Sequence, residues 1–283
     1  MSQDIVEWLS QNEISQIESS VYWNDVEIEK EKEWWIESAQ DKKLIKYLKQ
    51  DTNLERAFLD LVKYSESNGY DLRGVVLDLA AGTCWTSAIV SKMRNVQKVL
   101  AIDISRHRLE TIAPIVFKQY EADIKKITRV LGSFDRLKME ASSVDCIILV
   151  EAFHHAYNVD NLMKEITRVL KPNGIVLISG EIIKTNIYYF KVVMLNIMTK
   201  VICALGMYKL LNRYLGKTIV APKKIFALLF DERTGDHSYI VNDCGRIFKR
   251  YGFELKIQKL NYKWPGGTGR DYNFLAVKRL PKA

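Results

Sequence analysis

Two apolar runs joined by a turn of small residues constrain this chain more than any other part of its 283 residues. The first run, residues 75–79, leads into a turn at residues 80–84 that reads Ala-Ala-Gly-Thr-Cys. The second run ends in Asp103, 21 residues after Gly82. Small residues let the backbone approach a ligand closely, and an acid at this distance is placed to accept hydrogen bonds from both hydroxyls of a ribose. The pattern predicts a β-turn-α-β unit that binds an adenosine group.

The number of glycines in the turn separates two classes of adenosine cofactor. A dinucleotide site uses three glycines, for the tight turn, for the approach of the pyrophosphate and for helix packing. Here Gly82 stands alone, and the bulky Trp85 occupies the position of the third glycine. The turn therefore disfavours a pyrophosphate and favours an adenosine that carries none.

The same stretch resembles motif I of the class I S-adenosylmethionine (SAM)-dependent methyltransferases, written (D/E)-x-G-x-G-x. Asp78 and Gly82 match that motif, whereas Ala80 and Cys84 replace its first and last glycines. Later motifs of the family have counterparts in order along the chain. They are the loop after strand three at residues 132–137, strand four at 143–155, and the helix and turn before strand five at 164–174. The resemblance covers about residues 74–181.

The resemblance implies an α/β fold with a Rossmann-like sheet of seven strands, mostly parallel and with the last strand antiparallel. N-terminal helices and a helical lid insertion complete the expected fold. Apolar periodicity predicts helical structure over residues 1–68, a helix before Pro172 and another at 241–251. The expected strands are residues 75–79, 99–103, 127–131, 145–150, 175–179, 255–260 and 273–278.

Four regions follow from this organisation. They are an N-terminal helical cap at residues 1–72, a SAM-binding core at 73–181, a helical substrate-binding lid at 182–240 and the closing part of the core sheet at 241–283.

SAM is the cofactor that the resemblance implies. Ser133 and the amide of Phe134 would clasp the adenine, with Ser133 standing where most relatives place an aspartate. An N-terminal aromatic such as Tyr22 or Trp23 would cover the methionine end, because a ring face suits a sulfonium cation. The expected cofactor-binding residues are Asp78, Ala80, Gly82, Asp103, Ile104, Ser133, Phe134, Glu151 and Tyr22.

Methyl transfer to a hydroxyl requires a base near the ends of strands four and five. Glu151 begins the loop where relatives contact the cofactor, so cofactor positioning is expected of it rather than proton abstraction. His154 and His155 are adjacent and cannot both face one point, and Glu181 ends strand five. His237 lies between the insertion and the last helix and is the favoured base, although a loop histidine is also compatible with simple solvation. No metal site is predicted, because adjacent histidines alone do not make one.

The insertion and the basic C-terminal part leave alternatives open. Residues 182–283 carry 19 Lys+Arg and 6 Asp+Glu, which suits either a solvated surface or an anionic partner. The largely apolar stretch 187–211 is interrupted by lysines and is too short between them to span a bilayer. A pair of lid helices over the active site is favoured, and contact with a membrane surface is the alternative.

The expected acceptor is a small molecule, anionic or a carbohydrate, and methylation of a hydroxyl oxygen is favoured. The basic lid suits a sugar or a lipid-linked or nucleotide-linked carbohydrate. RNA or protein acceptors and a catalytically inactive scaffold are the alternatives, nucleic acid is disfavoured, and a homodimer is compatible with the sequence. The first residues show neither a basic n-region nor an apolar h-region, so no signal peptide is expected. Scattered cysteines indicate reduced thiols and a cytoplasmic location; they are Cys84, Cys146, Cys203 and Cys244.

Overall fold

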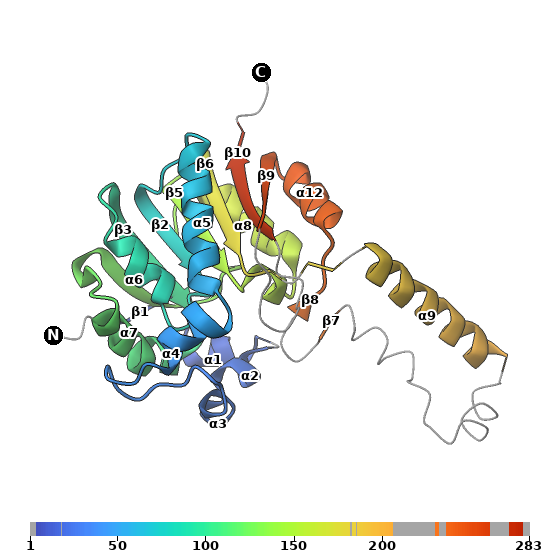
Figure 1. Ribbon diagram of the computed structural model, residues 1–283, viewed down its shortest axis with the longest axis horizontal. Coiled ribbons are helices and arrows are strands. Elements are labelled where there is room, and N and C mark those ends of the chain that lie inside the picture. Colours follow the sequence, from blue (N-terminus) through green and yellow to red (C-terminus); the bar gives the residue numbers. More distant parts are fainter. Residues whose placement is uncertain are drawn as a thin grey trace.

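A mixed sheet lies at the centre of the protein (Figure 1). The computed structural model describes residues 4–17, 19–181, 183–184, 186–205, 230–231, 236–260 and 272–279. Within these residues the sheet has eight strands in the order β1-β4-β3-β2-β5-β6-β10-β9. The strands are β1 (Val6–Glu7), β2 (Gly74–Leu79), β3 (Val96–Asp103), β4 (Ile127–Leu131), β5 (Val144–Val150), β6 (Leu170–Ser179), β9 (Phe253–Lys259) and β10 (Tyr272–Lys278).

The pairing of the strands confirms the predicted fold class. The neighbours from β1 through β6 pair in parallel, whereas β10 is antiparallel to both β6 and β9. All seven predicted strands are present. The eighth strand, β1, was not predicted, because a strand of two residues is too short to show an alternating pattern. It places Val6 beside Val130 at the edge of the sheet.

Strand β6 begins five residues earlier than the sequence indicated. Helix α8 (Val159–Val169) ends just before Leu170, which is already extended and pairs with Val144. Pro172 favours an extended residue before it, and the expected turn is an irregularity within the strand, where Asn173 has a φ angle of +59° and the register with β5 shifts.

Helices cover both faces of the sheet, as Figure 1 shows. Alternate residues of each strand point to opposite faces. Val76 of β2 therefore joins a core with α5, α6 and α7, while Leu77 joins a second core with α8 and α12. These helices are α5 (Leu54–Ser67), α6 (Trp85–Ser91), α7 (Ala113–Gln119) and α12 (Val241–Arg250).

The N-terminal region is less helical than predicted. Residues 31–42 form turns, although Trp35 and Ile36 within them are buried. Their apolar pattern reflects burial against the core rather than a helical repeat. The helices before α5 are short: α1 (Gln11–Ser15), α2 (Ser20–Asn24), α3 (Val26–Lys30) and α4 (Lys43–Lys46), the last continued by a π-helical turn at Tyr47–Asp51.

A buried ion pair fastens this region to the core. Glu29 of α3 receives two hydrogen bonds from the guanidinium of Arg108, at 2.9 Å to Nε and 2.6 Å to Nη2. The Glu29 side chain is 1% exposed. Burial opposes the charge of Arg108, but the contacts with Glu29 outweigh it and hold the pKa of Arg108 above its usual value.

The insertion leaves the core beside β6 and returns next to its own starting point. Lys184 donates its amide to the carbonyl of Tyr239 at 2.8 Å. Helix α9 (Asn186–Ala204) extends away from the sheet in Figure 1, and β7 (Phe230–Asp231) pairs with β8 (Asp236–His237). A second predicted lid helix falls on residues outside those described. No helix in the described part of the chain is long and apolar enough to cross a membrane.

We predict that Glu29→Gln lowers the free energy of unfolding by about 3 kcal/mol, because the buried Arg108 charge loses its partner. Glu27→Gln is the matched control: Glu27 lies on the same helix, is 81% exposed and pairs only with Lys30, so its loss should cost less than about 1 kcal/mol. Urea denaturation of both variants measures the difference. Equal stability of the two variants would contradict this role of the ion pair.

Candidate functional site

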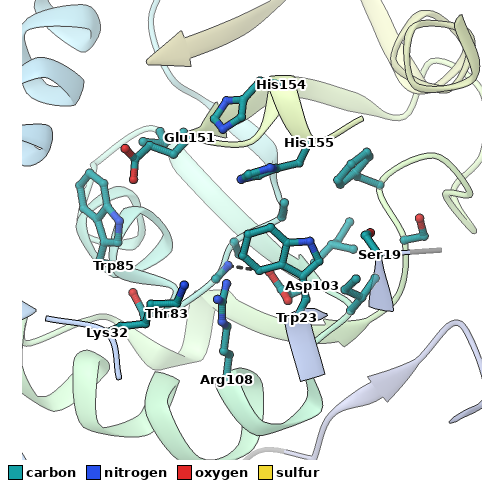
Figure 2. Close-up of a pocket in the computed structure, with 18 of the residues that line it drawn as sticks. Ser19, Trp23, Lys32, Thr83, Trp85, Asp103, Arg108, Glu151, His154 and His155 are labelled. Carbon is teal, nitrogen blue, oxygen red and sulfur yellow. Dashed lines mark hydrogen bonds between the residues drawn. The ribbon is translucent and has the colours of Figure 1, made fainter. Parts of the chain in front are cut away.

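A cavity of about 390 Å³ opens at the carboxyl ends of β2, β3, β4 and β5. This edge is where ligands bind in open α/β sheets, and the volume suits a cofactor-sized molecule. Figure 2 shows Asp103, Arg108 and Trp23 on one side of the cavity and Glu151, His154 and His155 on the other.

The turn after β2 adopts the conformation of a glycine-rich loop with one glycine in it. Ala80, Gly82 and Cys84 have φ angles of +53°, +54° and +61°. Non-glycine residues pay roughly 1 kcal/mol or more for this left-handed region, so the surrounding structure must impose it. The two positions where Ala80 and Cys84 replace family glycines thus keep the backbone shape. Ala80 and Gly82 both line the cavity.

Asp78 supports the turn from behind. It is buried and does not line the cavity. Its Oδ2 accepts hydrogen bonds from the hydroxyls of Thr86 and Ser87, both at 2.6 Å, and burial raises its pKa to about 6. Asp78 therefore positions the start of α6. Its position away from the cavity does not favour the direct contact with a cofactor that the sequence predicted.

Asp103 ends β3 and lines the cavity together with Ile104. One carboxylate oxygen accepts the amide of Gly82 at 2.7 Å and the other accepts the amide of Ser105 at 2.8 Å. Each carboxylate oxygen has two acceptor sites, so one on each oxygen is left by these bonds. This donor-acceptor count fits a ribose with two adjacent hydroxyls.

The loop after β4 brings an acid that the sequence analysis missed. Ser133 and Phe134 line the cavity as predicted, and Asp135 lines it beside them. The Ser133 hydroxyl donates to the Asp135 carboxylate. The sequence signal that could have identified Asp135 is its position two residues after Ser133.

The N-terminal region contributes Trp23 in place of Tyr22. Tyr22 accepts a hydrogen bond from Lys32 Nζ at 2.9 Å and is not among the lining residues, whereas Trp23 and Lys32 are. The Trp23 ring lies 5.2 Å from the Arg108 guanidinium and 4.7 Å from the His155 ring. Arg108 also lines the cavity, and nothing in its local sequence distinguished it.

Glu181 organises the loop after β5 without lining the cavity. It is buried, and its carboxylate accepts the backbone amides of Ala152, Phe153 and His154 at 3.0–3.2 Å. It also bonds His154 Nδ1 at 2.7 Å. Burial alone would lower the pKa of His154, but the charge and hydrogen bond of Glu181 hold it above its usual value. Glu181 is a positioning residue that orients His154 and raises its pKa.

His155 differs from its neighbour in partner and in charge. Its Nδ1 lies 2.5 Å from Asp236 Oδ1, and both residues line the cavity, as do His154 and Glu151. Burial and the nearby His154 lower the pKa of His155, with Asp236 opposing them. With Nδ1–H donated to Asp236, Nε2 carries a lone pair and can accept a proton. Environments that push two neighbouring pKa values apart are typical of acid-base sites.

His237 is not among the residues that line the cavity, whereas Asp236, one position earlier, is. Its ring stacks near Tyr239, at 5.8 Å between centroids. Burial lowers the pKa of His237, opposed by hydrogen bonds with the backbone of Tyr157 and Ala156. Because neighbouring residues of a strand point to opposite sides, β8 turns Asp236 toward the cavity and the predicted His237 away from it.

Three side chains here could also serve as metal donors. Within the described residues, His154, His155 and Asp236 each place one ligand atom within 4.8 Å of the others. Sequence spacing concealed this set, because Asp236 lies 81 positions after His155. Two of the donors already share a hydrogen bond with each other.

Comparisons with known proteins agree with this site. Residues 77–178 match the family model of the methyltransferase domain. A malonyl-[acyl-carrier protein] O-methyltransferase of Methylovorus sp. (strain MP688) is 32% identical over 127 residues, which cover 44% of this chain and 40% of that protein. An uncharacterized methyltransferase-like protein of Schizosaccharomyces pombe is 32% identical over 108 residues, 37% of each chain. The matches therefore span about two fifths of these curated relatives.

Solved structures share the fold at low sequence identity. The YcgJ protein of Bacillus subtilis superposes with a TM-score of 0.52 and 15% identity, covering 80% of this chain and 100% of that one. The [4+2]-cyclase SpnF gives a TM-score of 0.51 with 14% identity, covering 78% and 80%. The fold alone does not determine the reaction, because it also carries a cyclase. Residues 77–178 therefore match a methyltransferase domain, and the solved structures share the fold of the whole sheet around it.

Proposed function

We propose that the protein transfers a methyl group from SAM to an oxygen nucleophile of a small polar acceptor. The observation that carries the proposal is one continuous cavity with an adenosine-type end at Gly82 and Asp103 and a general-base pair, His155 and Asp236, within it. The relative from Methylovorus is named as an O-methyltransferase, which is in keeping with an oxygen acceptor.

The lining residues suit SAM, an adenosine cofactor that contains no pyrophosphate. The backbone at residues 80–83 would hold the adenosine, and the remaining acceptor sites of Asp103 would bind the ribose hydroxyls. The ring of Trp23 offers a face that suits a sulfonium. When bound, SAM supplies a methyl group already activated toward a nucleophile, so the protein's tasks are alignment, exclusion of water and removal of a proton.

His155 is proposed as the base, in place of the His237 favoured by the sequence. Asp236 orients His155 through Nδ1 and leaves Nε2 to take the acceptor proton. His154, which Glu181 binds through Nδ1, lies beside His155 and lowers its pKa, which favours the neutral, basic form of His155. Glu151, which also lines the cavity, would position ligands there.

A carbohydrate acceptor, free or lipid-linked, suits the lining best. Tyr157 would offer an aromatic ring against which the C–H side of a sugar can pack. Glu151, His155 and Asp236 offer hydrogen-bonding groups for its hydroxyls. The acceptor can be identified by incubating cell extract with methyl-labelled SAM and analysing the labelled products by mass spectrometry, with Asp103→Ala protein as the blank.

We predict that SAM and S-adenosylhomocysteine stabilise the protein and that NAD does not, because the turn suits an adenosine without a pyrophosphate. Ligand at about 100 times its dissociation constant adds roughly 2.7 kcal/mol to the free energy of unfolding. Thermal melting measures the shift. A shift with NAD and none with either adenosyl compound would reverse the cofactor assignment, and no shift with any of them would favour a scaffold that has lost turnover.

We predict that His155→Ala lowers the methylation rate by about 10²- to 10⁴-fold while SAM affinity changes little, because the lost base acts on the acceptor. His237→Ala is the matched control and should retain most of the rate. A large loss in His237→Ala with near-normal turnover in His155→Ala would restore His237 as the base.

The pH profile gives a second test of the base. A base works only when deprotonated, and the lowered pKa of His155 lies below the usual histidine value of about 6.5. The rate should therefore be flat above pH 7 and fall as the pH drops below the pKa of His155. A rate that still climbs steeply between pH 7 and 9 would argue against His155, and a hydroxyl-bearing acceptor should be used because an amine titrates itself.

We predict that turnover needs no divalent metal, because His155 and Asp236 already bond each other and His154 Nδ1 is taken by Glu181. Rates before and after extensive dialysis against EDTA should agree. Activity that EDTA abolishes and added zinc or magnesium restores would assign His154, His155 and Asp236 as metal ligands instead.

A further inference from the structure

Helix α9 carries a continuous stripe of exposed apolar side chains, which we call the α9 stripe. At about 100° per residue, its members fall within an arc of roughly 100° on one side of the helix. Phe190 is 64% exposed and Met198 is 55% exposed. The α9 stripe consists of Ile187, Phe190, Met194, Ile197, Met198, Val201 and Leu205.

The α9 stripe stands away from the rest of the protein. Figure 1 shows α9 projecting from the sheet, and no residue of α9 lines the cavity. A helix of 19 residues is about 28 Å long. Soluble monomers rarely leave so much contiguous apolar surface in water, and such surfaces mark interaction sites.

The charge of the insertion indicates what covers the stripe. Between Glu181 and Asp231 the sequence contains eight Lys+Arg and no Asp or Glu. Lys191, on α9 itself, is exposed. A second copy of the chain would bring cationic segments together, which is unfavourable. An anionic surface would attract them, at about 1 kcal/mol per Lys or Arg near the lipid headgroups.

We propose that the α9 stripe docks the protein on membranes that contain anionic lipids. The helix lies in the interface with its apolar side among the acyl chains near the headgroups, while the exposed Lys191 contacts lipid phosphates. Helix α9 does not meet the requirements for a bilayer span, so the contact is peripheral. Binding of this kind requires neither SAM nor an acceptor, and it stands independently of the proposed methyl transfer.

The position of the insertion connects this surface to the cavity. Ile183 forms a bridge with Tyr239, so the segments that lead into and out of the insertion lie side by side. Asp236, three residues before Tyr239, lines the cavity. The helix that carries the α9 stripe and the strand that carries Asp236 therefore belong to one insertion, whose two ends meet beside the cavity.

Sedimentation with vesicles tests the proposal on the whole 283-residue chain. The vesicles are phosphatidylcholine alone and an equimolar mixture of phosphatidylcholine and phosphatidylglycerol. We expect binding to the mixed vesicles, little binding to phosphatidylcholine alone, and weaker binding at high ionic strength. Equal binding to both kinds of vesicle, or to neither, would overturn the proposal.

Two triple variants distinguish binding through the α9 stripe from non-specific binding through other exposed apolar residues. Phe190→Ser/Met194→Ser/Met198→Ser removes the centre of the stripe and should raise the lipid concentration for half-binding by about tenfold or more. The control, Val6→Ser/Ile124→Ser/Ile257→Ser, changes three exposed apolar residues of the body, which are 38–45% exposed, and should bind like the wild type. Circular dichroism and melting establish that both variants are folded.

Two results with these variants would overturn the proposal. The first is equal loss of vesicle binding in both variants. The second is a concentration-dependent dimer of the wild type, seen by light scattering, that the stripe variant alone disperses without any change in vesicle binding. That second result would assign the stripe to self-association.

Discussion

The contact between Asp103 and the turn after β2 is the constraint on which the rest of the site depends. The Gly82 amide donates to one oxygen of Asp103, which joins the ends of two neighbouring strands. That bond fixes the distance between the backbone cradle and the acid. Asp78 holds the other side of the turn through Thr86 and Ser87, so both flanks of residues 80–84 are fastened before any ligand arrives.

The acceptor end of the cavity is assembled from distant parts of the chain. Glu181 shapes the loop after β5 by accepting three backbone amides, and β8 returns from the insertion to place Asp236 against His155. From the N-terminal region, α3 fixes Arg108 through Glu29, and Trp23 lies against both Arg108 and His155. The two ends of the cavity that we assign to cofactor and acceptor therefore share a wall made by the N-terminal segment.

The sequence predicted the fold well because sheet strands and turn residues leave local patterns. The seven longer strands, the antiparallel β10 and the cavity lining at Gly82, Asp103, Ser133 and Phe134 are visible in short segments. What the sequence could not show is pairing over long separations. The bond between His155 and Asp236 joins positions 81 apart, and that between Glu29 and Arg108 joins positions 79 apart. The prediction of a helix over residues 31–42 was wrong for a related reason. Apolar residues that are buried in turns there have a spacing similar to that of a helix.

The most direct test of the central claim is a titration of S-adenosylhomocysteine and its 2′,3′-dideoxy analogue against wild-type protein and Asp103→Asn, by calorimetry. If Asp103 binds the ribose, loss of the hydroxyls should weaken binding to the wild type by about 1.5–3 kcal/mol per charge-assisted hydrogen bond. The same loss should have a much smaller effect in Asp103→Asn. An equal penalty in both proteins would contradict the assignment of this cavity as an adenosine site read by Asp103.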